Sequence, residues 1–138
     1  MSYYIGIDIG TSSVKAMLIN ENEIQNTISK DYPIYLSNGN YAEQNPEDWY
    51  RQSMLAMKEL LRDVDKSEVK AIGFCGQMHG LVLLDEKDEV IRPAILWNDG
   101  RSEKEVDYLN NKIGKDFLLD NTGNIAFAGF TAPKLLWV

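Results

Sequence analysis

The sequence predicts an α/β fold with a mixed sheet, an N-terminal antiparallel meander and flanking helices. Three observations support this expectation. Three segments have the residue pattern or composition of strands and are separated by short polar turns: 3–9, 14–19 and 24–31. A segment with helical periodicity begins at residue 46. The apolar run 69–75 comes after that helix, and a strand in this position favours parallel pairing by a right-handed crossover.

The first strand carries its apolar and its small or acidic residues on opposite faces. One face holds Ile5, Ile7 and Ile9, and the other holds Gly6, Asp8 and Gly10. If the isoleucines face the core, Asp8 projects to the other side from a floor that lacks side chains. Gly10 and Thr11 then predict a tight turn into the second strand.

The first helix has clear start signals. Asn45 is a candidate N-cap, Pro46 suits the first helical position, and two acidic residues follow in the first turn. Its apolar residues recur at helical spacing and predict one buried stripe: Tyr50, Met54, Met57, Leu61 and Val64. The run after this helix, 69–75, is expected to be a buried strand.

The C-terminal half predicts shorter elements. Two short strands are expected at 81–85 and 94–97, around the turn EKDE. Ser102 and Glu105 have the spacing of a capping box before a second helix, whose apolar stripe comprises Val106, Leu109 and Ile113. The final segment, TAPKLLWV, predicts another helix, and because the sequence stops within it, we expect a fragment of a longer protein.

Composition excludes several classes of function. The chain has 138 residues and a net charge of −7, and its 14 basic residues form no cluster, so nucleic acid is not an expected partner. No apolar run approaches the roughly 20 residues that span a bilayer, so no membrane is expected. A single cysteine and the lack of a secretion signal favour the cytoplasm.

The stretch IGIDIGTSSVK has the chemistry of a phosphate site. Backbone N–H groups at a glycine turn, hydroxyls and a cation complete an anion's coordination shell, and the stretch supplies Gly10, Thr11, Ser12, Ser13 and Lys15. Asp8 is suited to hold Mg²⁺ through water, because Mg²⁺ keeps several waters when one or two carboxylates bind it. The alternative is a hairpin whose polar residues serve only the turn, beside a solvated aspartate.

Two later motifs have the chemistry of a sugar site. GQMHG, at 76–80, follows a strand and presents Gln77, Met78 and His79, whose amide and imidazole groups can serve sugar hydroxyls. ILWNDGR, at 95–101, presents Trp97 as a flat apolar face beside Asp99. The alternatives are a structural loop histidine, a packing methionine, and a turn with a surface ion pair between Asp99 and Arg101.

Taken together and in this order, the motifs resemble the FGGY carbohydrate kinases, and most closely their xylulose-phosphorylating members. AEQNPEDWY, RPAILWNDGR and TGNIAFAGFTAPKLLWV extend the resemblance over nearly the whole chain. It implies an actin-like, ribonuclease-H-like ATPase domain that transfers the γ-phosphate of MgATP to D-xylulose and gives D-xylulose 5-phosphate. Residues 1–138 would be the N-terminal part of the first, sugar-binding domain, and the second, nucleotide-binding domain would be absent.

The resemblance also implies residue roles. Asp8 would position Mg²⁺ and act in catalysis, and the phosphate path would be lined by the turn residues already named. The sugar would meet Met78 and His79, with Trp97 and Asp99 at the border of the same cleft. Glycerol kinases, which look similar, carry an Arg-Glu pair in place of Met78 and His79 and a tyrosine in place of Gly129. A longer acceptor than glycerol could then fit.

Other functions stay open within and beyond this family. The acceptor can be ribulose, gluconate or glycerol, or the chain can be a non-enzymatic actin-like module that binds ATP. The resemblance implies a catalytic base and an adenosine pocket beyond residue 138, so we expect the chain alone to be inactive. It also implies a sugar and ATP as partners and a homodimer of the full-length protein.

Overall fold

The computed structural model describes residues 2–21 and 23–138. The chain forms two compact units, one from the residues up to Pro33 together with Pro46–Gln77, and one from Ile34–Asn45 together with Met78–Val138. Within this described part, no helix combines the length and the apolar content needed to cross a membrane. Each unit has its own sheet, and the predicted site residues are divided between them.

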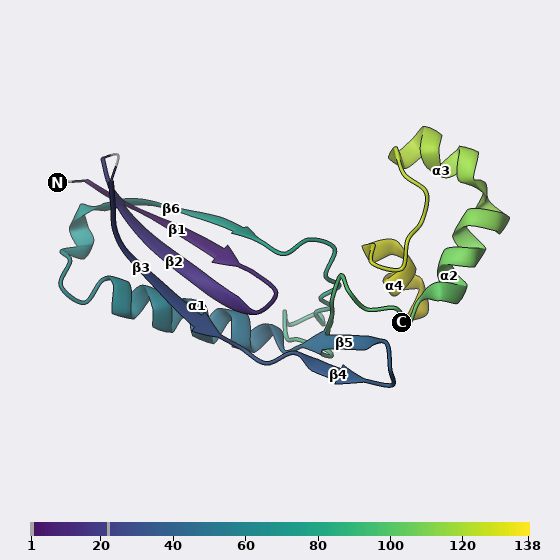
Figure 1. Cartoon of the computed structure of the whole chain (residues 1–138), viewed down its shortest axis with the longest axis horizontal. Helices are drawn as coiled ribbons and strands as arrows, with labels where there is room; N and C mark the ends of the chain where they lie inside the picture. Colours follow the sequence, from purple (N-terminus) through teal and green to yellow (C-terminus); the bar gives the residue numbers. More distant parts are fainter. Residues whose placement is uncertain (1, 22) are drawn as a thin grey trace. The chain divides into compact units, whose positions relative to one another are not determined.

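The first unit is built on a four-stranded mixed sheet in the order β3-β2-β1-β6 (Figure 1). Strands β1 (Tyr3–Ile9), β2 (Ser13–Asn20) and β3 (Glu23–Asp31) form an antiparallel meander. Strand β6 (Val69–Gly76) pairs with β1 in parallel. The predicted meander and the parallel pairing after the helix are therefore both confirmed.

Helix α1 (Pro46–Leu60) packs against β2 and β3 and closes the core of this unit. It begins at the predicted proline, with Glu47 and Asp48 in its first turn. The short 3-10 helix η1 (Lys66–Glu68) then leads into β6. The core lies between the sheet and α1. Strands β1 and β2 and the residue after β3 contribute Ile5, Ile7, Val14, Ala16, Leu18 and Tyr32, and α1 contributes Ala56 and Leu60.

The predicted apolar stripe of α1 is wrong in its first half. Tyr50 and Met54 are 66% and 45% exposed, whereas Ser53, Ala56 and Leu60 are buried. The buried face is turned toward small residues, which let the helix approach the sheet closely. The second half of the prediction holds, since Met57, Leu61 and Val64 pack against the core.

Strand β6 was expected to be buried, and this expectation is also wrong. Its residues are exposed from Lys70 to Gly76, with Phe74 at 69% and Ile72 at 44%. The reason is its position, because β6 is the edge strand of this sheet and α1 lies over β2 and β3. An apolar run predicts a strand, but it does not say how many layers of the described chain cover it.

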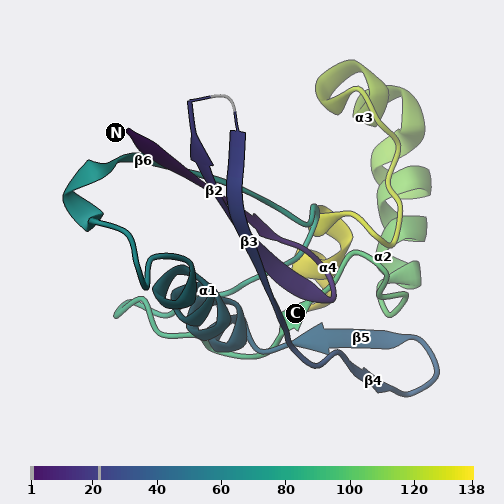
Figure 2. The ribbon, with the colours of Figure 1, turned by 60° about the vertical axis from the view of Figure 1, so that its left-hand side comes forward.

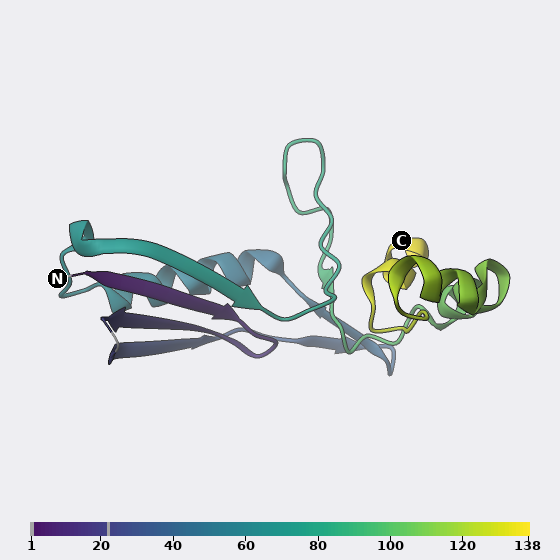
Figure 3. The same cartoon turned by 90° about the horizontal axis from the view of Figure 1, so that it is seen from above.

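The second unit combines a small antiparallel sheet with a set of helices. Its strands are β4 (Tyr35–Ser37), β5 (Tyr41–Gln44) and β7 (Ala94–Ile95), in the order β4-β5-β7. Figure 2 shows the β4–β5 hairpin. The helical part consists of α2 (Glu103–Tyr108), the π-helical segment η2 (Leu109–Gly114), α3 (Lys115–Thr122) and α4 (Thr131–Trp137) (Figure 3).

Two expectations for this unit need correction. The pair of strands around EKDE is reduced to β7 and two isolated bridges, Leu81 to Ile95 and Leu84 to Val90. The capping box is absent, because Ser102 makes no side-chain cap bond and its hydroxyl donates to the Ala128 carbonyl at 3.4 Å. The final helix is confirmed as α4.

The orientation of α1 can be tested with two truncations on the same helix. Leu60→Ala removes a side chain that is 3% exposed, so it should lower the free energy of unfolding by about 2–5 kcal/mol. Met54→Ala, at 45% exposure, should cost less than about 1 kcal/mol. Urea unfolding of the two variants measures this difference, and equal losses would contradict the orientation.

Candidate functional site

Asp8 lies on the face of β1 that points away from the core. Ile5 and Ile7 are 3% and 1% exposed, and Asp8 is exposed on the opposite face, as the alternation predicted. Its cross-strand neighbours are Lys15 on β2 and Cys75 on β6. Side chains at such paired positions stand about 5 Å apart at Cβ, so one cation and one thiol flank the carboxylate.

A hollow of about 380 Å³ opens around this carboxylate, and its floor is backbone. Gly6 and Gly73 are paired across β1 and β6, and a Cβ added to either would meet no atom within 4 Å. The hollow is lined by residues of β1, β2 and β6: Gly6, Ile7, Asp8, Lys15, Met17, Gly73, Phe74 and Cys75. The space that the sequence predicted beside Asp8 therefore exists.

The turn that follows β1 is held by several hydrogen bonds. Gly10 N–H donates to the Ser13 carbonyl at 3.0 Å, and the Tyr32 hydroxyl donates to the Gly10 carbonyl. Gln77 N–H donates to the Ile9 carbonyl at 2.8 Å, and Gln77 Nε2 lies 3.5 Å from the Gly10 carbonyl. Gln77 was expected to contact sugar, and in this structure it supports the turn beside Asp8.

The charge of Asp8 acts on two titratable neighbours, Tyr32 and Cys75. Burial and then the charge of Asp8 raise the pKa of Tyr32 to about 12. Desolvation, followed by a hydrogen bond and repulsion from Asp8, raises the pKa of Cys75. Asp8 is the only carboxylate among the described residues that line the hollow. One carboxylate with room for water fits a hydrated Mg²⁺, although the described residues contain no cluster of three or more metal ligands.

In the second unit, Met78 and His79 are exposed on the loop that follows β6. Met78 is 71% exposed. His79 has a positive φ of 59°, which is uncommon for a residue with a side chain, and its ring stacks on Phe130 with centroids 4.5 Å apart. His79 also borders a hollow of about 490 Å³ beside α4, and it is the only predicted sugar residue among the described residues that line it.

The loop after β7 holds Trp97 at the surface and Asp99 in the interior. Trp97 is 48% exposed, whereas Asp99 is 2% exposed. Asp99 accepts hydrogen bonds from Ala42 N–H at 2.6 Å and from Arg101, through Nε at 2.9 Å and Nη2 at 2.7 Å. The ion pair between these two residues is therefore real, but it is buried and does not lie at the surface.

Arg101 connects this loop to β5 and α4. Its Nη1 lies 2.8 Å from Glu43, and its guanidinium stacks over Tyr41 at 3.9 Å and near Trp137 at 5.0 Å. Burial alone would raise the pKa of Asp99, but the hydrogen bonds from Arg101 and Ala42 hold it below its usual value. The loop that presents Trp97 is thus fixed by charged contacts.

Sequence analysis missed Lys134, which is completely buried in α4. Its ammonium donates to the His79 carbonyl at 2.7 Å and to the Gly129 carbonyl at 2.6 Å. Burial lowers the pKa of Lys134 to about 8, although the charge of Asp99 acts in the opposite direction. Hydropathy would place the lysine at the surface and its leucine neighbours in the core. The structure shows the reverse, since Leu135 and Leu136 are more than half exposed.

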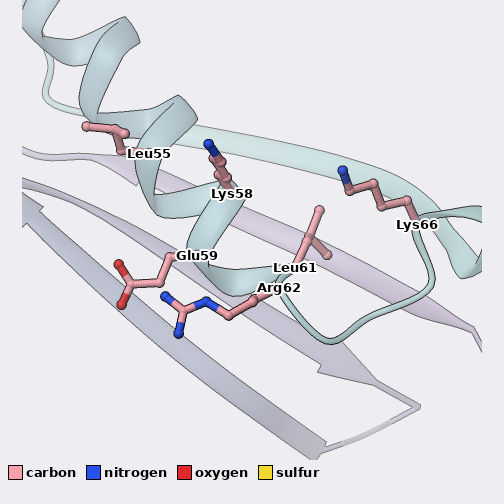
Figure 4. A pocket seen from close by; sticks show the side chains of 6 residues that line it. All are labelled: Leu55, Lys58, Glu59, Leu61, Arg62 and Lys66. Atoms are coloured by element: carbon pink, nitrogen blue, oxygen red, sulfur yellow. The ribbon is translucent and has the colours of Figure 1, made fainter.

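The predicted residues thus fall into two sets. The first unit holds the phosphate set and Gln77: Asp8, Gly10, Thr11, Ser12, Ser13, Lys15 and Gln77. The second unit holds Met78, His79, Trp97 and Asp99. A further hollow, of about 440 Å³ along α1, contains none of them; Figure 4 shows its charged lining, which includes Lys58, Glu59 and Arg62.

Comparison with known proteins assigns the family. The profile of the FGGY family of carbohydrate kinases, N-terminal domain, matches residues 3–138. A xylulose kinase of Bacillus subtilis is 48% identical over 141 residues, which cover 100% of this chain and 28% of that protein. The chain belongs to the FGGY carbohydrate kinase family, and it spans less than a third of the length of this relative.

Solved structures agree with this assignment. A xyloylose kinase from Brucella ovis superposes with a TM-score of 0.91 at 41% identity, over 99% of this chain and 29% of that one. A gluconate kinase from Lactobacillus acidophilus also gives a TM-score of 0.91, at 28% identity, over 99% and 28% of the two chains. The fold is therefore that of the actin-like ATPase domain of sugar kinases, as the resemblance implied.

The proximity of Asp8 to Tyr32 can be tested by titration. Asp8→Asn removes the charge that contributes to the pKa of about 12, so the pKa of Tyr32 should fall, while burial keeps it above its ordinary value of 10.0. NMR of ¹³C-labelled tyrosine during a pH titration measures it. Asp63→Asn, at an exposed loop position, is the control. An unchanged Tyr32 pKa in Asp8→Asn would show that the carboxylate points away from the phenol.

Proposed function

We propose that the full-length protein carrying this chain transfers the γ-phosphate of MgATP to the ketopentose D-xylulose and releases D-xylulose 5-phosphate. One observation carries the phosphate part of this proposal. A single carboxylate stands in a hollow with a glycine floor, between a lysine and a turn rich in hydroxyls. The 48% identity to a xylulose kinase supports the choice of acceptor.

In this proposal, the first unit serves the transferred phosphate. Asp8 would hold Mg²⁺ through water, which would supply positive charge beside the phosphate oxygens. Thr11, Ser12 and Ser13 offer hydroxyl and backbone donors to these oxygens, together with Gly10. Lys15 stands across from Asp8 and supplies a cation to the same oxygens.

The second unit serves the sugar, whereas Gln77, in the first unit, supports the turn beside Asp8. The imidazole of His79 both donates and accepts hydrogen bonds, and Met78 offers an apolar surface. Trp97 presents half of its surface to solvent and suits the C–H face of a sugar. Asp99 is buried and its carboxylate is occupied by Arg101 and Ala42, so we assign it to fixing the loop of Trp97 instead of contacting the sugar.

Other parts of the reaction are assigned to chain outside these 138 residues. Phosphoryl transfer needs a carboxylate that orients the attacking hydroxyl and a pocket for adenosine, and we place both in the remainder of the full-length protein, together with the second domain. The isolated chain should therefore show no turnover. A cytoplasmic location and a homodimer of the full-length protein complete the proposal.

A second acceptor has specific support. The gluconate kinase from Lactobacillus acidophilus superposes as well as the xyloylose kinase, which favours gluconate as the alternative to D-xylulose. A panel of D-xylulose, D-ribulose, gluconate and glycerol with full-length protein and MgATP separates the two, because a site built for one set of hydroxyls leaves polar groups unpaired with another. Preference for gluconate would overturn the choice of xylulose and keep the family.

The role of Asp8 predicts a kinetic effect on catalysis. Asp8→Ala removes the group that holds the metal, so kcat of the full-length protein should fall by about 100-fold or more. Asp63→Ala, at an exposed loop position of the same unit, is the control and should keep kcat. A coupled ADP-release assay measures both. Unchanged kcat in Asp8→Ala would contradict the assignment.

The role of His79 predicts a different effect. His79→Ala removes one sugar contact but leaves the phosphate set intact, so the KM for sugar should rise by about 10-fold while kcat changes little. Val82→Ala, further along the same loop and 39% exposed, is the matched control. Initial rates over a range of sugar concentrations measure it. A fall in kcat at constant sugar KM would move His79 out of the sugar site.

A further inference from the structure

Lys134 is the most unusual charged residue of the second unit. Its side chain has no exposed surface, although a lysine is almost never fully buried without partners. The partners here are two backbone carbonyls, at His79 and Gly129, at 2.7 and 2.6 Å. Both acceptors in these contacts are backbone carbonyls and neither is a carboxylate, so the ammonium of Lys134 joins two backbone segments.

The first carbonyl belongs to the predicted sugar loop. His79 lies 55 positions before Lys134 and has a left-handed backbone conformation, with φ of 59°. Such a conformation costs free energy in a residue with a side chain, and it persists only when surrounding contacts hold it. The bond from Lys134 is one of these contacts, because it fixes the carbonyl of His79 itself.

The second carbonyl belongs to the loop before α4. A Cβ on Gly129 would lie 2.6 Å from the Trp97 carbonyl oxygen, so Gly129 packs directly against the backbone that carries the indole. The next residue, Phe130, stacks on the ring of His79 at 4.5 Å. A bond from Lys134 to Gly129 therefore acts on both rings, on Trp97 through backbone and on His79 through Phe130.

Two charged residues act on the ammonium of Lys134 in opposite directions. Asp99 favours the charged form and Arg101 opposes it. Asp99 and Arg101 are themselves paired at 2.7 Å, and among the described residues no carboxylate forms an ion pair with Lys134. The two carbonyls are then the direct acceptors that the structure gives for its protons.

We infer that Lys134 is a positioning residue for the acceptor sugar: its ammonium ties the loops of His79 and Gly129 together and so sets His79 and Trp97 in the arrangement that receives the sugar. This inference rests on the proposed function. Lys134 does not touch the sugar, since its side chain is completely buried. Loss of the two bonds should loosen sugar binding and leave nucleotide binding unchanged.

The first test is a spectroscopic one on full-length protein labelled with ¹³C-histidine. His79 is the only histidine of these 138 residues, and its Hε1 signal is identified as the one that His79→Ala removes. The ring of Phe130 should shift this signal upfield. Lys134→Met keeps the unbranched side chain up to the ε position and removes the ammonium with its donors, so the shift should be lost. Lys104→Met, at an exposed position of α2, should leave the signal in place.

The second test is kinetic and uses the full-length protein. Lys134→Met should raise the KM for sugar by about 10-fold or more, while the KM for ATP stays within about 2-fold. An unchanged sugar KM in an active enzyme would overturn the inference and leave the kinase proposal intact. If wild-type protein phosphorylates no sugar, the proposed function fails. The NMR test still decides the inference in that case, because an unmoved His79 signal in Lys134→Met would refute the positioning of His79 by Lys134.

A variant that keeps the cation covers the case in which Lys134→Met does not fold. Gly129→Ala places a Cβ against the Trp97 carbonyl, so it pushes the loop off Trp97 while Lys134 remains. It should move the His79 signal and raise the sugar KM in the same direction. Circular dichroism verifies folding of each variant, and a folded Gly129→Ala with a wild-type sugar KM would overturn the inference.

Discussion

The alternation of β1 is the constraint on which the phosphate hollow depends. Burying Ile5 and Ile7 contributes about 1.5–3 kcal/mol each, and a slip of one position would expose them and drive Asp8 into the core. A buried, unpaired carboxylate costs more than either isoleucine contributes. Both effects favour the same register, so the position of Asp8 follows from the packing of its neighbours. The glycines beside it then decide that the space around the carboxylate stays open.

Buried charged residues stabilise the second unit, whereas apolar side chains form the core of the first. Asp99, Arg101 and Lys134 are buried together, which is tolerated because each has direct partners: the Arg101 guanidinium for Asp99, Glu43 and Asp99 for Arg101, and two carbonyls for Lys134. Removing one member of such a set is strongly destabilising, since the other charges stay buried. The loops that carry His79 and Trp97 have little regular structure. Their backbone is held in place by these polar contacts, whereas strand pairing holds the backbone of the first unit.

The sequence predicted the meander, the helix start at Pro46, the parallel return and the outward face of Asp8, because these depend on local periodicity and on start signals. It failed where the outcome depends on neighbours far along the chain. Tyr50 and Met54 are exposed because Ser53 and Ala56 face the sheet, and Phe74 is exposed because β6 is an edge strand. Ser102 has capping spacing, yet its hydroxyl bonds Ala128. In the candidate site, residue types lead to the predictions for Asp8 and His79, but no sequence pattern marks a lysine whose partners are backbone carbonyls.

Cys75 gives the hollow around Asp8 a further property. Thiols react with oxidants and electrophiles as thiolates, and this form of Cys75 is disfavoured because desolvation, followed by a hydrogen bond with Asp8 and repulsion from its charge, raises the pKa of the thiol. The one sulfhydryl of the chain is exposed, yet a smaller share of it is ionised than in an ordinary surface cysteine. An alkylating agent should therefore modify this position more slowly than it modifies an isolated cysteine.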